Sequence, residues 1–183
     1  MCTSQNSEVV DGDDRKRLIR SEDPLRSEVL LLNRQRTVQA DWGSVRAFLD
    51  SLRENVSGLP FSVSLVSDRS IRRYNKRFRG HDEATDVLSF PADGGGQESN
   101  YLGDIVISVE TALEDAATYD ISLEEEIKML ALHGVLHMMG YDHETDQGQM
   151  ARAERLWGKR FGLAASLTAR SRKGRRMPQG VRQ

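Results

Sequence analysis

The sequence predicts an α+β domain in which a small mixed four-stranded sheet packs with about five helices. Two observations predict it. Short segments with strand patterns are interleaved irregularly with longer segments of helical spacing, which is compatible with an α+β or an α/β layer structure. In addition, 183 residues suffice for one domain plus tails, and 38% hydrophobic with 30% charged residues is typical of a soluble globular chain.

The first half of the chain alternates two predicted strands with two predicted helices. The first strand is Val29–Asn33, and residues 41–55 follow with apolar side chains at helical spacing and Asp41 as the N-cap. Phe61–Val66 alternates strictly, as a half-buried strand does. Asp68 is then expected to cap a second helix. The apolar face of that helix has three members: Ile71, Tyr74 and Phe78.

Two further strands are predicted on either side of a loop. Residues 86–91 form the third strand, which stops at Pro91 because proline cannot continue a ladder of hydrogen bonds. The stretch ADGGGQESN after it is typical of a flexible loop. The fourth strand, residues 102–108, leads directly into a short helix over residues 109–120.

The longest predicted helix begins at a capping box and ends at a glycine. Ser122 and Glu125 form the box, and Gly140 supplies the left-handed residue that commonly follows a helix. One apolar face of this helix consists of Ile127, Leu130, Ala131, Val135 and Met138. A last helix is predicted from about Glu144 to Phe161.

Polar tails are predicted on both sides of a single domain at residues 26–165. Residues 1–25 are polar and mixed in charge without periodicity, so we expect a disordered arm. Residues 166–183 form a basic tail, also expected to be disordered, with six cations and no acid from Arg170 onward. The formal net charge of −2 gives the whole molecule no general attraction for a polyanion.

Cysteine content and apolar runs indicate where the protein works. Cys2 is the single cysteine, which rules out an internal disulfide and a cysteine-based zinc site and fits a reducing cytosol. The first twenty residues lack the apolar run of a secretory signal, and Val29–Leu32 is too short to span a bilayer. We therefore expect a cytoplasmic protein.

Three of the four histidines lie in one stretch, HGVLHMMGYDH, at residues 133–143. A helix places His133 and His137 on one face, one turn apart. Gly140 then ends the helix, so that the following turn can return His143 to the same point. Three imidazoles with an open fourth position are typical of a catalytic zinc, whose bound water can reach a pKa of about 7. The alternative is that the two helical histidines are ordinary residues satisfied by hydrogen bonds.

Gly134 stands where a zinc protease of the H-E-x-x-H type carries its glutamate, the general base. One interpretation is that the glycine is simply tolerated, although a glycine inside a helix lowers helix stability by about 1 kcal/mol relative to alanine. The other is a place where another backbone or a substrate approaches closely. Either way the base is missing, which disfavours a protease.

The histidine stretch resembles the signature H-G-x-L-H-x-x-G-Y-D-H of the YbeY endoribonucleases and agrees with it at each fixed position. A second stretch, YNKRFRGHDEATDVLSFP, resembles the family's L-N-x-x-[YF]-R-x-x-D-x-P-T-D-V-L-S-F-P, and LGDIVIS resembles L-G-D-I-x-I-S. These motifs lie within residues 61–160. Tyr74 replaces a leucine and Ala84 replaces a proline, and neither departure removes a reactive group.

The resemblance implies a sheet with surrounding helices, one zinc ion, and a single-strand-specific endoribonuclease that acts in 16S rRNA 3′-end maturation and ribosome quality control. It also implies ribosomal RNA and the small ribosomal subunit as partners, and no membrane. Carried over by position, it implies that His133, His137 and His143 hold the metal and act in catalysis together with Arg79. Two alternatives stay open: a non-nuclease metallohydrolase (a peptidase or amidase), and a non-catalytic ribosome-associated module whose metal only holds the fold.

Arg79 belongs to the most basic part of the chain. Six cations occur within eleven residues: Arg69, Arg72, Arg73, Lys76, Arg77 and Arg79. A guanidinium group can contact two phosphate oxygens at once, so Arg79 is the candidate for stabilising charge on the scissile phosphate. We expect most of its neighbours to be solvated.

Four other polar residues have expected roles in the fold. Asp86 is expected to anchor its strand, although a carboxylate there could also orient a metal ligand. Asp104 is expected to fix the start of its strand, and Asp142 to shape the turn before His143. We expect His81 to be an exposed loop residue and not a ligand.

The basic tail gives a first prediction. Truncation before Arg170 should preserve folding and metal content but weaken RNA binding and flatten its dependence on salt, because fewer counterions are released. RNA-binding titrations of the full-length and truncated proteins at several salt concentrations measure the slope of the logarithm of the binding constant against the logarithm of the salt concentration. An unchanged slope would show that the tail does not contact RNA.

Overall fold

The computed structural model describes residues 29–92, 100–142, 146–163 and 167. The predicted arm at residues 1–25 lies outside these residues, and so does the predicted tail at 166–183 except for residue 167. Within the described ranges no helix is long and apolar enough to cross a membrane.

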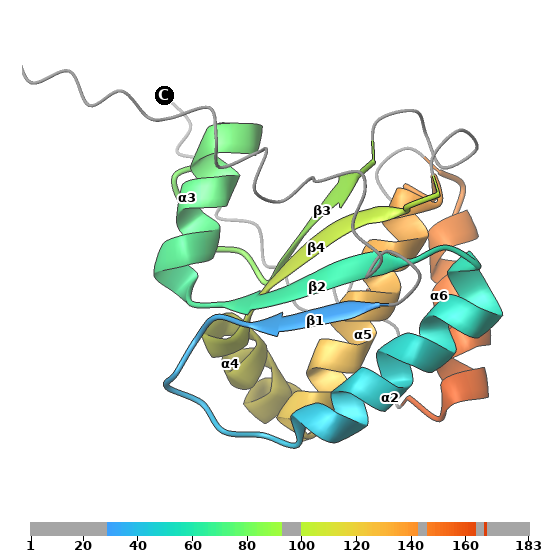
Figure 1. Cartoon of the computed structure of the whole chain (residues 1–183), viewed down its shortest axis with the longest axis horizontal. Helices are drawn as coiled ribbons and strands as arrows, with labels where there is room; N and C mark the ends of the chain where they lie inside the picture. The colour runs from blue at the N-terminus through green and yellow to red at the C-terminus, as the bar shows by residue number, and fades with distance from the viewer. Residues whose placement is uncertain (1–28, 93–99, 143–145, 164–166, 168–183) are drawn as a thin grey trace, which may run out of the picture.

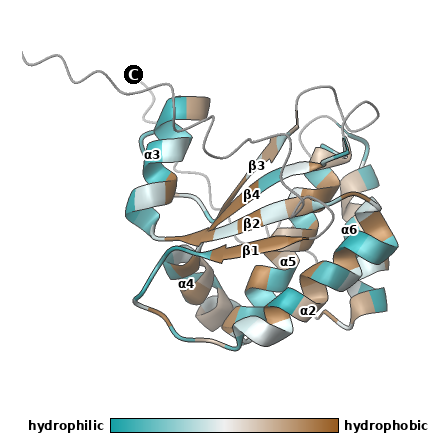
Figure 2. Ribbon diagram, viewed as in Figure 1, coloured by the Kyte–Doolittle hydropathy of each residue, from teal (hydrophilic) through white to brown (hydrophobic). Residues whose placement is uncertain are grey.

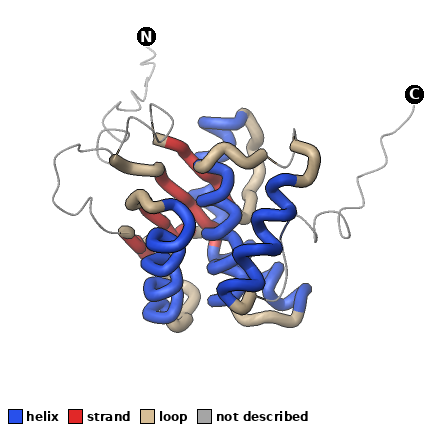
Figure 3. The backbone as a smooth tube through the Cα atoms, turned by 90° about the vertical axis from the view of Figure 1, so that its right-hand side faces the viewer, coloured by secondary structure: helices blue, strands red, loops and turns tan. Residues whose placement is uncertain are grey.

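Four strands form one mixed sheet in the order β1–β2–β4–β3. Strands β1 (Leu30–Asn33), β2 (Phe61–Val66) and β4 (Gly103–Ser108) are parallel, whereas β3 (Val87–Pro91) is antiparallel to β4 and lies at one edge. In the register, Ile105 of β4 lies between its partners in β2 and β3. Figure 1 shows this order directly, and in Figure 3 the strands form one slanted layer with helices packed beside them. The predicted α+β fold with a mixed sheet is confirmed.

Five helices surround the sheet in the described part of the chain: α2 (Trp42–Leu52), α3 (Asp68–Arg79), α4 (Val109–Tyr119), α5 (Leu123–Met138) and α6 (Gln149–Phe161). A π-helical turn, Arg53–Ser57, extends α2 and ends at Gly58 in the left-handed conformation. The sequence did not predict this turn.

The helices divide between the two faces of the sheet. Side chains of α2, α4, α5 and α6 share the main core with alternate residues of the strands, including Val63, Ile105 and Ile107. The intervening strand residues, such as Leu88 and Val106, face the other way and pack with α3. Helix α3 is also the most polar of the helices, as its largely teal surface in Figure 2 shows. The basic helix therefore packs on the opposite face of the sheet from the shared core of the other four, and its first turn bonds to α4.

Helix α5 is buried on nearly all sides. Between Glu126 and Met138 each residue is buried except Lys128 and His137, which are half-buried. It packs against α2, α4 and α6 as well as β3 and β4. The sequence predicted one apolar face, and the structure corrects this to a central helix enclosed by several elements.

Both ends of α5 are as predicted. Ser122 Oγ accepts a hydrogen bond from the backbone N–H of Glu125 at 3.1 Å. At the other end, Gly140 has a φ of +92° and donates to the carbonyl of His137, while Tyr141 donates to Leu136 at 3.1 Å. These two bonds form a Schellman motif, which satisfies carbonyls that the helix end leaves open. The N-cap of α2 is also confirmed, since Asp41 accepts from Ser44 N at 3.1 Å.

The predicted cap of α3 is wrong. Asp68 is the first residue of the helix, and Ser67 occupies the N-cap position. The Asp68 carboxylate instead accepts hydrogen bonds from the hydroxyls of Ser108 and Thr111, and its backbone N–H donates to Glu110 Oε2 at 2.8 Å. Asp68 therefore joins α3 to β4 and α4, a role that depends on tertiary partners.

The start of α6 is also corrected. The helix begins at Gln149 and not near Glu144, which lies outside the described residues. Gly148 precedes it with a φ of +85°. The Asp146 carboxylate accepts from the backbone N–H groups of Gly148 and Met150 at 2.6 and 2.5 Å, which fixes where the helix begins.

Gly134 is explained by close packing of α5 on the sheet. A Cβ at this position would lie 2.9 Å from both Ile105 Cδ1 and Ser89 Oγ. Contacts this short do not occur between unstrained atoms, so the side chains of β3 and β4 leave room only for hydrogen. The sequence predicted close approach of another backbone or of a substrate, and the structure corrects this to side chains of the sheet. The same contact leaves no space for the glutamate of a zinc protease at this position.

This packing predicts a difference between two helical glycines. Gly134→Ala should lower the free energy of unfolding, because overpacking typically costs about 1–3 kcal/mol. Gly158→Ala is the matched control, since nothing lies within 4 Å of a Cβ there. It should be neutral or stabilising by up to about 1 kcal/mol through helix propensity. Chemical denaturation measures both, and equal stabilisation by the two changes would contradict the packing argument.

Candidate metal centre

His133 and His137 converge near the C-terminal end of α5. The two Nε2 atoms lie 3.1 Å apart, and the ring centroids are 4.6 Å apart with an interplanar angle of 80°. His133 is buried and His137 is half-buried, so the pair is partly open to solvent. The helical spacing of four residues thus brings two nitrogen donors to one point, as predicted.

A buried glutamate from α6 holds the other nitrogen of His133. Glu154 Oε1 lies 2.6 Å from His133 Nδ1, and only 3% of Glu154 is exposed. An ionised carboxylate can only accept, which assigns the proton of a neutral His133 ring to Nδ1 and leaves the lone pair of Nε2 facing His137. Glu154 was not among the residues predicted from the sequence. The available signal was its place on the apolar stripe of α6, with Met150 and Trp157, where a charged side chain is unexpected.

The donor set suits a metal ion. Zinc binds imidazole nitrogens at about 2.0–2.1 Å in a tetrahedral arrangement, which places neighbouring donors roughly 3.3 Å apart. The measured 3.1 Å between Nε2 atoms is close to that spacing and is also the length of a hydrogen bond between two rings. The carboxylate on the far nitrogen is the partner that metal-binding histidines usually have.

His143, the third predicted ligand, lies outside the described residues. Accordingly, within the described ranges no group of three or more His, Cys, Asp or Glu side chains is placed to hold a metal. Next to His143 in the chain, the backbone carbonyl of Asp142 accepts a hydrogen bond from Asp146 N at 2.8 Å, and the turn-shaping role of the Asp142 side chain stays a prediction. Backbone N–H donors, that of Met150 first, lower the pKa of Asp146 and keep its carboxylate charged at the start of α6.

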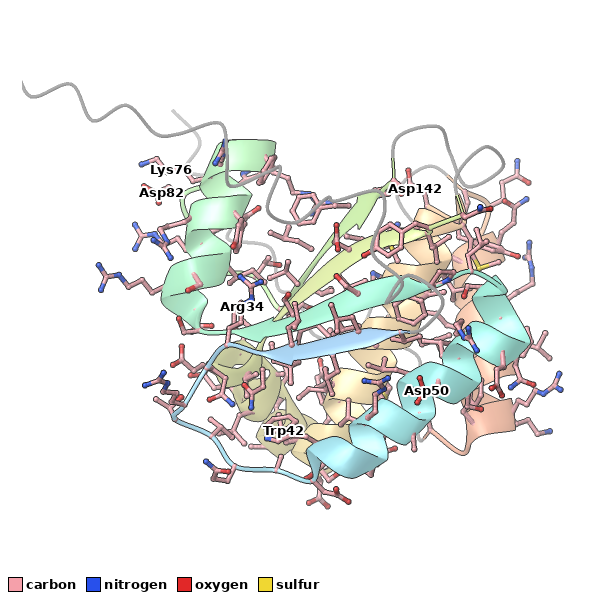
Figure 4. All side chains as sticks on the ribbon, in the orientation of Figure 1. Arg34, Trp42, Asp50, Lys76, Asp82 and Asp142 are labelled. Atoms are coloured by element: carbon pink, nitrogen blue, oxygen red, sulfur yellow. The ribbon has the colours of Figure 1, made fainter. Side chains whose placement is uncertain are left out.

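Arg79 is the exposed last residue of α3, on the opposite face of the sheet from α5. In Figure 4, Lys76 of α3 and Asp142, which follows α5, are well separated. The described residues therefore bring two of the predicted histidines together, whereas Arg79 belongs to a helix that packs on the other face of the sheet. The assignment of Arg79 as a catalytic residue stays a prediction.

Part of the basic charge on α3 is neutralised locally. Arg72 Nε and Lys76 Nζ each lie 2.9 Å from a carboxylate oxygen of Asp82, as Figure 4 shows for the lysine. Hydrogen bonds from these two cations, the arginine first, lower the pKa of Asp82. The guanidinium of Arg77 lies 5.4 Å from the centroid of the Phe78 ring.

The other polar residues have the structural roles expected of them. Asp86 Oδ1 accepts from Thr85 Oγ1 and from the backbone of the next residue at 2.8 Å, and so fixes the start of β3. Asp104 accepts from the hydroxyls of Ser62 and Tyr101, the latter at 2.7 Å, which secures the start of β4. His81 is exposed, as predicted.

A sequence profile described as Endoribonuclease YbeY matches residues 32–162. This range includes helices α2–α6 and the whole sheet apart from Leu30 and Leu31 of β1. The chain belongs to the YbeY family. Its relatives include the Endoribonuclease YbeY of Solibacter usitatus, 42% identical over 69% of this chain and 84% of that protein. The Endoribonuclease YbeY of Sulfurovum sp. is 35% identical over 78% of this chain and 97% of its own length.

A solved structure supports the same fold. The solution structure of a Thermotoga maritima protein superimposes with a TM-score of 0.52 and covers 84% of this YbeY-family chain and 99% of that protein. The sequences are 24% identical, so this likeness concerns the fold alone.

The converging imidazoles predict how metal content depends on each histidine. Replacing any one of His133, His137 or His143 with alanine should lower zinc content sharply, because three ligands leave no redundancy. Elemental analysis of each purified variant measures this. His81→Ala is the control and should leave the content unchanged. Full zinc occupancy in the His137→Ala protein would show that His137 is not a zinc ligand.

Proposed function

We propose that this YbeY-family chain is a zinc-dependent, single-strand-specific endoribonuclease that acts in the cytoplasm on ribosomal RNA of the small subunit, in 16S rRNA 3′-end maturation and ribosome quality control. Family membership supports the endoribonuclease class. The observation that carries the metal dependence is the convergence of His133 and His137, with Nε2 atoms 3.1 Å apart and Glu154 behind one ring. His143 completes the proposed ligand set.

The roles of the chain's own groups follow from their chemistry. His133, His137 and His143 would bind zinc through neutral nitrogens. When bound, zinc supplies polarisation of a phosphoryl oxygen and a water of lowered pKa. Arg79 would contact the phosphate through two N–H groups and stabilise negative charge as it develops there.

The surface of α3 suits single-stranded RNA. Phe78 was predicted to lie on the buried face of the helix, but 44% of it is exposed. Its ring rests edge-on against Phe90 of β3, with centroids 5.0 Å apart, beside the guanidinium of Arg77. An exposed aromatic ring among cations is the combination that binds unpaired bases by stacking and backbone phosphates by charge.

Two other functions are weaker candidates. A peptidase or amidase would need a general base beside the metal, and the packing at Gly134 leaves no room for the usual glutamate. A non-catalytic ribosome-associated module would bind zinc without cleaving RNA. Assays of the purified protein on single-stranded RNA and on casein separate the three: cleavage of RNA alone supports the proposal, and cleavage of casein alone or of neither overturns it.

Arg79 provides the sharpest test of catalysis. Arg79→Ala should leave zinc content unchanged and stability within about 0.5 kcal/mol, because the side chain is exposed. Cleavage should fall by roughly 10²–10³-fold, as when one preorganised charge-stabilising donor is lost. Arg79→Lys should recover only part of the rate, since an ammonium group does not reproduce the two-point contact.

Arg73→Ala is the matched control, an exposed cation of the same helix without an assigned role. Its cleavage rate should stay close to that of the unaltered protein. Equal rates for the Arg79 and Arg73 variants would mean that α3 contributes only diffuse positive charge.

A further inference from the structure

We propose that Glu154 is a positioning residue for the metal centre. Through its hydrogen bond to His133 Nδ1, it would hold that imidazole in the tautomer and orientation that direct Nε2 toward His137. The inference rests on the metal site of the proposed function and adds a residue from a different helix to it.

Both ring nitrogens of His133 face a partner. Glu154 Oε1 lies 2.6 Å from Nδ1, on one side of the imidazole, and His137 Nε2 lies 3.1 Å from Nε2 on the other. Because a carboxylate accepts only, the proton of the neutral ring resides on Nδ1. The lone pair of Nε2 is then available at the point where the second histidine also presents a nitrogen. Rotation of the ring would break the bond to Glu154.

Packing alone does not explain a glutamate at this place. Glu154 is 3% exposed and lies between the buried residues Met150, Ala153 and Gly158 on the inner side of α6. An apolar residue there would avoid the cost of removing a carboxylate from water, which is several kcal/mol unless the charge is paired. The hydrogen bond to His133 offsets that cost, so the carboxylate has a specific partner in the ligand.

Glu154 also links the position of α6 to the site. Residues 139–148 join α5 to α6, and His143 lies within them. One end of this segment is fixed by the Schellman motif at Gly140, and the other by the Asp146 carboxylate at the start of α6. The hydrogen bond between Glu154 and His133 joins α6 to α5 beyond that segment.

Two variants of similar volume test the role. Glu154→Met fills the same space without an acceptor, whereas Glu154→Gln keeps a neutral acceptor. We expect zinc affinity, measured with zinc alone by competition against a chromophoric chelator, to fall roughly 10–100-fold in the methionine variant. The glutamine variant should lose less. Glu126→Gln is the matched control, because Glu126 is the other buried glutamate in the described residues and lies on α5. The zinc affinity of this variant should be unchanged.

A second measurement identifies the cause. Nitrogen-15 NMR of the metal-free proteins should show the Nδ1–H tautomer of His133 in the unaltered chain and a mixture of tautomers in the methionine variant. Unchanged zinc affinity and an unchanged tautomer in Glu154→Met, whatever its thermal stability, would overturn the inference and leave Glu154 as a structural contact between helices. Failure of the unaltered protein to bind zinc would instead overturn the metal dependence in the proposed function.

Discussion

The enclosure of helix α5 is the physical constraint on which the rest of the structure depends. It packs on β3 and β4 closely enough that position 134 has room only for a glycine, and α2, α4 and α6 cover its remaining sides. A helix held on all sides cannot rotate or slide without opening the core. The backbone positions of His133 and His137 are therefore fixed by the packing of the helix. Bringing the two side chains together costs little additional conformational entropy. A donor pair arranged in advance is the property that a metal centre requires.

The same enclosure explains how a buried carboxylate is tolerated beside these histidines. Burial of Glu154 is unfavourable by itself, and its hydrogen bond to His133 is short and largely shielded from water, which strengthens it. The interaction can form only if α5 and α6 are already packed together. Conversely, loss of the hydrogen bond would remove a buried polar contact between the two helices. Packing of the core and orientation of the histidine are thus linked by one contact.

Features with partners close in sequence could be predicted, and features with distant partners could not. The strands, the five helices, the Ser122 cap and the glycine end of α5 follow from local periodicity and local hydrogen bonds. Asp68 was assigned as a cap because nothing local shows that its carboxylate bonds to a hydroxyl 40 residues away. Glu154 was missed for the same reason, since 21 residues separate it from His133. Two of the three proposed ligands could be placed together only because a helix relates them.

Strand β3 determines how the two proposed functional groups can act on one substrate. Its residues alternate between the faces of the sheet: Ser89 lies against α5 at Gly134, and Phe90 contacts Phe78 of α3. Strand β3 lies at the edge of the sheet and, like its neighbour β4, contacts both α5 and α3. Arg79 and the histidines are proposed to act on one phosphate, so the substrate would have to reach the end of α3 and the end of α5 together. A single strand is more flexible than a duplex, which agrees with the unpaired substrate proposed above.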